Sequence, residues 1–173
     1  MVRMEYIFTI TFIISGAVTF FAVPSWIIKA RMGGLVGKDM HKQDKREVAE
    51  IGGIPVLFGF TIGVLALVAI QTFYFNSVQS ITEILAILLT ILIIGIIGII
   101  DDILGWKIGL KQWQKPILTL FAALPIVVVN AGNTIMYLPF VGNIDLGLLY
   151  PLFVVPIAIT GASNGLNMVS GYN

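Results

Sequence analysis

The sequence predicts an all-α polytopic membrane protein with about five transmembrane helices. Hydrophobic residues make up 58% of the 173-residue chain and charged residues 11%, whereas soluble domains contain roughly 45 to 50% and about 25% respectively. The few charges also divide the chain into apolar runs of about the length that crosses a bilayer. Both observations favour a chain that crosses the membrane several times.

A membrane span needs about 20 mostly apolar residues, and five runs approach this length. The first run carries Pro24 near its end, where a kink costs least, and it is too long for the core of a signal peptide. Between the fourth and fifth runs, residues 130–145 combine Gly and Asn with alternating apolar residues, a pattern typical of a small hairpin. The five predicted spans are residues 6–28, 51–75, 84–100, 116–129 and 146–162.

The Lys and Arg residues are concentrated in two segments of the chain. Of the ten Lys and Arg residues, six lie in residues 29–50 and three in residues 101–115. Because cytoplasmic loops of membrane proteins carry an excess of Lys and Arg, we expect both segments on the cytoplasmic side. The N-terminus and the hairpin are then outside, and residues 164–173 are inside. Three polar segments therefore meet on the cytoplasmic face.

Composition also narrows the chemistry and the organisation. The chain has no cysteine, which excludes disulfides, thiolate metal sites and cysteine nucleophiles. A net charge of +1 that is sorted by membrane side does not indicate a nucleic-acid partner. We interpret residues 1–173 as a single transmembrane domain, and a chain that stops within a polar motif after a span suggests the first half of a longer protein.

Two adjacent acids, Asp101 and Asp102, close the third predicted span. Burying ionised carboxylates is costly unless they are paired, and the partial negative charge of a helix C-terminus repels them further. A divalent cation or a group of cationic side chains would compensate both effects. The alternative is a pair of interfacial acids that reach into water.

Lys107, Lys111 and Lys115 follow the acids at intervals of four residues. On one helix they would line up on one side, within reach of the acids or of a phosphate. The alternative is that they snorkel to the interface and set the topology. For Lys115, at the start of a span, we favour that alternative.

The first cytoplasmic loop is rich in glycine and lysine, but it is not a Walker motif. The spacing from Gly33 to Lys38 is one residue short, and Asp39 stands where Ser or Thr should follow. The loop can still meet an anionic ligand or lipid headgroups. His41 has no second histidine, so we expect it to be solvated, whereas Glu50, directly before a span, is harder to explain as surface.

The stretch "NGLNMVSGYN" places Asn164, Asn167 and Asn173 in a predicted glycine-broken turn after the fifth span. Amides supply neutral oxygen ligands for hard cations and hydrogen bonds for a nucleobase or sugar. The alternative is that Asn and Gly are there only because they form turns readily.

Five segments carry a resemblance to a known family: "KDMHKQDKREVAEIGGI", "DDILGWKIGLKQWQKP", "ALPIVVVNAGNT", "IDLGLLY" and "NGLNMVSGYN". In this order they resemble the polyprenyl-phosphate N-acetylhexosamine-1-phosphate transferases, glycosyltransferase family 4, and most closely the dolichol-using N-acetylglucosamine-phosphotransferase branch. Members have about ten spans, so the resemblance also implies that this chain is a first half.

The resemblance implies transfer of a sugar 1-phosphate from a UDP-sugar to a polyprenyl phosphate, with release of UMP, at the cytoplasmic membrane face. It implies Mg²⁺ as cofactor, and a homodimer is left open. The implied roles are metal ligation by Asn167, binding or deprotonation of the acceptor phosphate by Asp101 and Asp102, phosphate binding by Lys111, and a uridine pocket shaped by Met40, Glu50 and Asn173 with Asn164 nearby.

Two positions depart from the family pattern. Residue 105 is Gly where close relatives carry Asn, which affects the surroundings of the acids. Residue 170 is Ser where muramoyl-pentapeptide transferases carry Asp, which favours the N-acetylglucosamine branch. The alternatives are another phospho-N-acetylhexosamine transferase of the family, or a noncatalytic transporter or binding subunit. A transporter predicts polar groups near the bilayer midplane, whereas the charges here lie at one interface.

Overall fold

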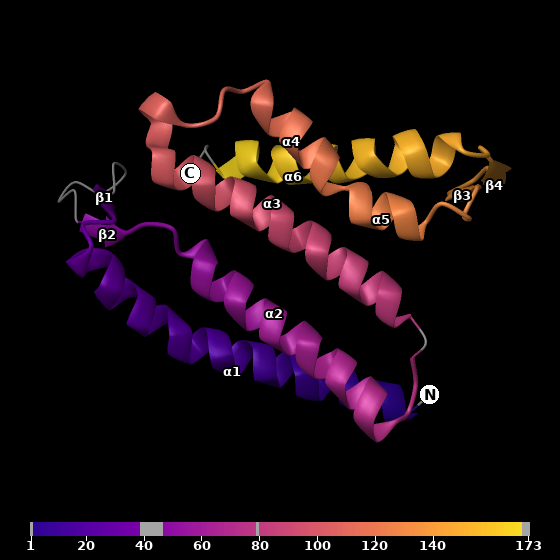
Figure 1. Cartoon of the computed structure of the whole chain (residues 1–173), viewed down its shortest axis with the longest axis horizontal. Coiled ribbons are helices and arrows are strands. Elements are labelled where there is room, and N and C mark those ends of the chain that lie inside the picture. Colours follow the sequence, from indigo (N-terminus) through magenta and orange to yellow (C-terminus); the bar gives the residue numbers. More distant parts are fainter. Residues whose placement is uncertain (1, 39–46, 79, 171–173) are drawn as a thin grey trace. The chain divides into compact units, whose positions relative to one another are not determined.

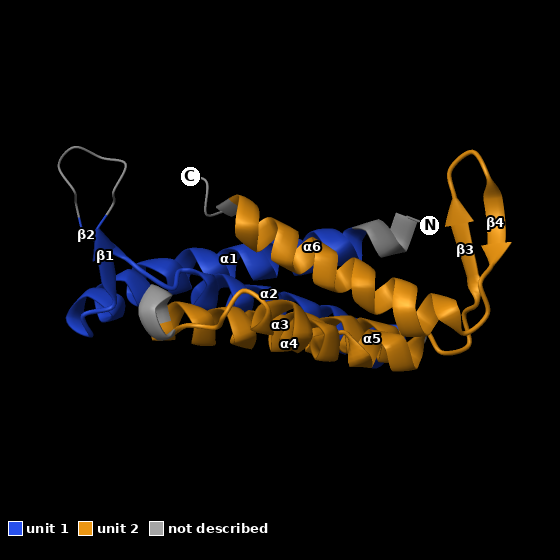
Figure 2. Ribbon diagram, turned by 90° about the horizontal axis from the view of Figure 1, so that it is seen from above, with its two compact units in different colours: residues 1–79 blue, residues 80–173 orange. Residues whose placement is uncertain are grey.

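The computed structural model describes residues 2–38, 47–78 and 80–170 of this mostly helical chain (Figure 1). The chain divides into two compact units, Met1–Gln79 and Ser80–Asn173, which Figure 2 shows in separate colours. Within the described residues, four helical segments are long and apolar enough to cross a membrane: Tyr6–Met32, Gly53–Tyr74, Ile81–Leu104 and Tyr150–Val169. The predicted all-α polytopic membrane fold is thereby confirmed.

Unit 1 consists of two long helices and a short ladder between them. Helix α1 (Val2–Met32) packs against α2 (Gly53–Ala69), which continues as the π-helix η1 (Ile70–Tyr74). Strands β1 (Val36–Lys38) and β2 (Glu47–Ala49) pair antiparallel. They frame residues 39–46 of the basic loop, so part of the predicted loop is ordered as a two-stranded ladder.

Helices α1 and α2 lie side by side (Figure 1). They approach closely because glycines on α2 face small hydroxyl side chains on α1. A Cβ on Gly59 would collide with the Thr19 hydroxyl and lie 3.0 Å from the Ser15 carbonyl oxygen. A Cβ on Gly63 would lie 2.7 Å from the Ser15 Cβ. Small residues at such crossings let helix backbones pack in a membrane, where no hydrophobic effect drives helices together.

Unit 2 begins with helix α3 (Ile81–Ile108), followed by two short helices, α4 (Gln114–Ala122) and α5 (Leu124–Val129). The π-helix η2 (Tyr150–Val154) then leads into α6 (Val155–Ser170). Helices α4 and α5 each contact both α3 and α6, so together they link the two long helices of this unit. At the junction of α4 and α5, the small side chains of Ala122 and Ala123 are buried, as is typical where helices pack closely in a membrane.

The predicted hairpin is confirmed. Strands β3 (Ile135–Leu138) and β4 (Gly142–Asp145) pair antiparallel, with Ile135 opposite Asp145, and Figure 2 shows them beside one end of the helical ribbon labelled α6. The turn carries Phe140 and Gly142 at positive φ, 71° and 93°. Hydrogen bonds from the Gly147 N–H and the Thr134 hydroxyl hold the pKa of Asp145 below its usual value.

The boundaries of three predicted spans differ in the structure. The fourth is divided into α4 and α5, because Pro125 has no N–H to donate and restricts the residue before it; together they form a shorter apolar segment, Gln114–Val129. Helix α3 continues eight residues beyond the predicted end at Ile100, so the two acids lie within it. Helix α6 likewise continues through Asn164 and Asn167, where we expected a turn.

We predict that Gly59→Ala and Gly63→Ala each destabilise the packing of α1 on α2. Each added methyl group overpacks the crossing, at a cost of about 1 to 3 kcal/mol. Thermal unfolding in detergent would show a lower melting temperature. Gly16→Ala is the matched control, because a Cβ there meets nothing within 4 Å and alanine favours a helix over glycine by about 1 kcal/mol. Equal melting temperatures for all three variants would contradict the packing.

Candidate functional site

The Asp101 carboxylate is held by the protein itself. Its Oδ1 accepts a hydrogen bond of 2.9 Å from the Leu110 backbone N–H, and its Oδ2 lies 2.5 Å from Lys115 Nζ. The side chains of Lys115 and Asp101 are 27% and 19% exposed. The connector after α3 therefore folds back over the helix end, and Asp101 joins α3, this connector and the first turn of α4.

Asp102 is in a different situation from its neighbour. It is exposed, and successive residues of a helix point about 100° apart, so it does not share the direction of Asp101. Among the described side chains, no hydrogen bond or ion pair engages its carboxylate. One acid is thus compensated by the fold, while the other presents its oxygens to whatever lies outside the protein.

The three lysines do not line up on one helix, so that prediction is wrong. Helix α3 ends at Ile108, Lys111 lies in the connector, and Lys115 belongs to α4. The Lys111 backbone N–H donates to Gln114 Oε1 at 2.8 Å and the residue is exposed. Lys115 is therefore the cation at Asp101, which corrects our preference for a purely interfacial role.

A second polar link joins α4 to α6. The buried Thr119 hydroxyl lies 3.0 Å from the Lys115 carbonyl oxygen and 3.1 Å from that of Pro116. Asn164 Nδ2 lies 2.8 Å from Thr119 Oγ1 and 2.9 Å from the Thr160 carbonyl oxygen. Asp101, Lys115, Thr119 and Asn164 thus form a continuous polar connection across three helices.

Sequence reasoning missed Thr119. The available signal was that it is the one polar side chain in residues 116–129 and stands four residues after Lys115. On a helix these two positions share a face. A single hydroxyl in an apolar run therefore marked the face of α4 that meets a polar partner.

The other predicted site residues are distributed as follows. Asn167 is exposed on α6, one turn after Asn164. Met40 and Asn173 lie outside the described residues. Glu50 belongs to unit 1, where its carbonyl oxygen accepts a 3.1 Å hydrogen bond from the Trp26 indole N–H and its backbone N–H donates to Leu35. The structure therefore brings Asp101 and Asn164 into one network, with Lys115 and Thr119 between them.

Three of the predicted site residues carry oxygens of the kind that Mg²⁺ accepts: Asp102 has a carboxylate, and Asn164 and Asn167 have amide oxygens. No group of three or more His, Cys, Asp and Glu side chains comes together within the described part of the chain. A metal at this site would therefore need amide, water or substrate oxygens beside the carboxylates.

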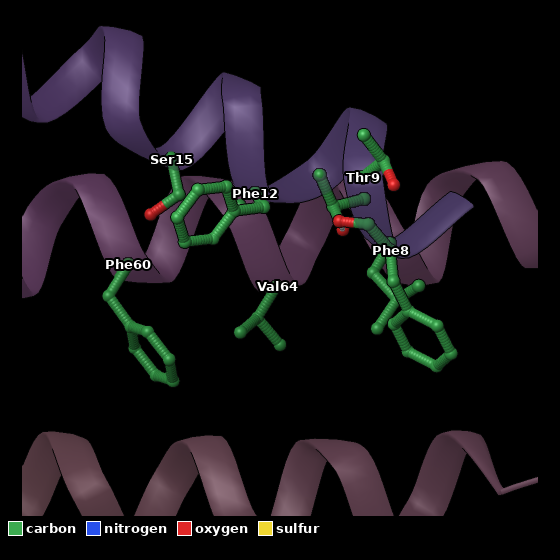
Figure 3. Close-up of a pocket in the computed structure, with 9 residues that line it drawn as sticks. Phe8, Thr9, Phe12, Ser15, Phe60 and Val64 are labelled. Atoms are coloured by element: carbon green, nitrogen blue, oxygen red, sulfur yellow. Dashed lines mark hydrogen bonds between the residues drawn. The ribbon is translucent and has the colours of Figure 1, made fainter. Parts of the chain in front are cut away.

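Two cavities lie away from the acids. One of about 530 Å³, between α1 and α2, is lined by apolar and hydroxyl side chains, of which Figure 3 labels Phe8, Phe12 and Phe60 among others. One of about 640 Å³ lies between the start of α3, the hairpin and α6, with Glu83 as its charged lining residue. Neither is lined by Asp101 or Asp102.

Comparison with known proteins decides the family. The family model described as glycosyl transferase family 4 matches residues 84–173, which include the whole polar connection from Asp101 to Asn164. The chain belongs to glycosyl transferase family 4. The predicted resemblance is thereby confirmed.

Named relatives of this family 4 chain come from archaea and a eukaryote. A Saccharolobus solfataricus protein provisionally named UDP-N-acetylglucosamine–dolichyl-phosphate N-acetylglucosaminephosphotransferase is 34% identical over 149 residues, which are 86% of this chain and 43% of the relative. A Sulfolobus acidocaldarius protein with the same provisional name is 30% identical over 93% of this chain and 48% of its own length.

A Dictyostelium discoideum protein named UDP-N-acetylglucosamine–dolichyl-phosphate N-acetylglucosaminephosphotransferase is 27% identical over 92% of this chain and 42% of the relative. The chain spans about half the length of the curated relatives it matches.

We predict that Lys115→Met destabilises the protein more than Lys111→Met. Removing Lys115 leaves the partly buried Asp101 without its cation, which costs about 1 to 3 kcal/mol, whereas the exposed Lys111 has no ion pair to lose among the described residues. Thermal unfolding of both variants in detergent measures the difference. A Lys115→Met protein as stable as Lys111→Met would contradict the ion pair.

Proposed function

We propose that the protein transfers N-acetylglucosamine 1-phosphate from UDP-N-acetylglucosamine to a polyprenyl phosphate of the dolichyl type. The products are UMP and a lipid-linked pyrophosphoryl N-acetylglucosamine, the first intermediate of lipid-linked oligosaccharide synthesis for glycosylation. The observation that carries the proposal is the contrast between Asp101, paired with Lys115, and the exposed Asp102, within the segment that matches family 4. The names of the relatives indicate the two substrates.

The reaction exchanges one bond to phosphorus for another. An oxygen of the lipid phosphate attacks the phosphorus that carries the sugar, and the bond from this phosphorus to the bridging oxygen breaks. UMP leaves with that oxygen. Because both reactants are anions, catalysis consists mainly of alignment and charge compensation.

The side chains of unit 2 divide this work. Lys115 compensates Asp101, so Asp101 acts by fixing the end of α3 and the start of α4. Asp102 faces outward and contacts the reacting groups. The acceptor phosphate is already largely ionised near neutral pH, since its second pKa is about 6, so Asp102 is needed for orientation more than for proton removal. The exposed Lys111 is placed to bind a phosphate oxygen.

Mg²⁺ fits the oxygen donors of this region. Asp102 and Asn167 are the residues that would hold it, in keeping with its preference for carboxylate and amide oxygens. When bound, the ion neutralises negative charge on the diphosphate.

We place the reaction on the cytoplasmic side because all three lysines of unit 2 lie between residues 107 and 115, at the Asp101 end of α3. Glu50 and the undescribed Met40 and Asn173 are proposed to shape the uridine pocket, on the family resemblance. A homodimer is also proposed, and the mass of the detergent-purified protein tests it.

The test uses the full-length protein that carries this sequence, in detergent, with a polyprenyl phosphate, Mg²⁺ and radiolabelled UDP-N-acetylglucosamine. We expect lipid-soluble label that requires Mg²⁺, and a loss of about 100-fold or more in kcat for Asp102→Asn. Glu83→Gln, an exposed acid in the first turn of the same helix, is the matched control and should retain activity.

If the protein transfers the sugar phosphate from a different UDP-N-acetylhexosamine, the proposed reaction stands and only the identity of the sugar changes. No transfer from any such donor by the folded protein would overturn the proposal and favour a transport or binding role.

A further inference from the structure

The hydrogen bonds around Asn164 identify which end of its amide faces the protein. The hydroxyl of Thr119 has one hydrogen, and the carbonyl oxygens of Lys115 and Pro116 lie 3.0 and 3.1 Å from the hydroxyl oxygen. Since carbonyl oxygens only accept, that hydrogen is directed to them. The Thr119 oxygen is therefore left to accept a hydrogen bond from Asn164.

The backbone carbonyl oxygen of Thr160 also requires a hydrogen-bond donor from Asn164. This oxygen lies 2.9 Å from Asn164 Nδ2 and can only accept. Two acceptors on separate helices thus face one amide, and only the NH₂ end satisfies both. An amide rotated by 180° would direct its oxygen at two other oxygens, so the assignment follows from the network.

This arrangement uses both hydrogens of the Asn164 amide. An asparagine has two N–H donors and one carbonyl oxygen, and the donors are engaged by Thr119 and Thr160. The oxygen Oδ1 is then the group that Asn164 has left for a ligand. Asn164 can accept a hydrogen bond or hold a cation, but it cannot donate to a phosphate oxygen.

Because Thr119 is buried, water does not easily substitute for its contact with Asn164. Thr119 is 5% exposed, so water does not readily replace its hydroxyl if it is removed. Without it, one Asn164 N–H loses its partner, and only the Thr160 carbonyl oxygen still holds the amide in this orientation. The contact also spans 45 residues of sequence and joins α6 to α4, the helix whose Lys115 holds Asp101.

We propose that Thr119 is a positioning residue, which fixes the Asn164 amide so that its Oδ1 oxygen is presented to an electropositive group of the bound substrates. This inference rests on the proposed transferase function. The electropositive group is either the divalent cation with its water shell or a hydroxyl of the nucleotide sugar. Both are recognised by the same amide oxygen.

The test compares Thr119→Val, which removes the hydroxyl and keeps the shape, with Thr119→Ser, which keeps the hydroxyl. Thr11→Val is the matched control. Thr11 is also buried and bonds the carbonyl oxygens three and four residues before it, at 3.1 and 3.0 Å. Among the described residues no side chain is seen to donate to it, so this control loses the same local bonds without the cross-helix contact.

Transfer kinetics provide the first readout. We expect Thr119→Val to lower kcat/KM by about 5- to 30-fold, the factor that corresponds to one lost contact. Thr119→Ser should stay within about threefold of wild type because it restores the acceptor. A rise in the Mg²⁺ concentration for half-maximal rate assigns the oxygen to the cation, and a rise in KM for UDP-N-acetylglucosamine assigns it to the nucleotide sugar.

Thermal unfolding without ligands provides a second readout that needs no activity. Thr119→Val, Asn164→Ala and the double variant form a double-mutant cycle. If the two side chains share a hydrogen bond, Thr119→Val lowers the melting temperature in the wild-type background and has little further effect once Asn164 is alanine. Additive changes would overturn the inference.

The outcomes separate this inference from the proposed function. Wild-type transfer with unchanged kinetics in Thr119→Val, or with equal losses in Thr119→Val and Thr11→Val, overturns the positioning role alone. A wild-type protein that neither transfers the sugar phosphate nor gains thermal stability from Mg²⁺ and UDP-N-acetylglucosamine overturns both.

Discussion

The ion pair between Asp101 and Lys115 is the constraint on which the site depends. A partly buried carboxylate is costly without a cation, and the nearest lysine along α4 meets it at 2.5 Å only because the connector after Ile108 reverses the chain. The Leu110 N–H secures this reversal by bonding the same carboxylate. Once Lys115 is fixed, the helical spacing brings Thr119 to α6, and Asn164 is oriented in turn.

Asp101 and Asp102 therefore have different structural roles, although they are adjacent on α3. The protein compensates the charge of Asp101 and uses it to hold α3, the connector and α4 together. Asp102 keeps an exposed carboxylate, which is what a site for cations or phosphate groups requires. For the proposed transfer reaction, this division would give two anionic substrates a fixed frame and an accessible charged group.

The two units obtain their helix packing in different ways. In unit 1, glycines on α2 let the backbone of α1 approach, and Gly59 and Gly63 meet the Ser15 and Thr19 positions. In unit 2, charged and amide side chains connect the helices through Asp101 and Asn164. Both devices suit a membrane, where small residues and interhelical hydrogen bonds replace the hydrophobic effect as the source of helix association. The polar contacts between the helices of unit 2 lie at the proposed site.

The sequence by itself determined the membrane fold class, the apolar runs, the hairpin at residues 130–145 and the family, because hydropathy, turn residues and motif order are local properties. Tertiary structure decided which lysine meets Asp101 and which end of the Asn164 amide faces the protein. These contacts join residues 14 and 45 positions apart. They depend on where α3 ends and how α4 meets α6, which local periodicity does not specify.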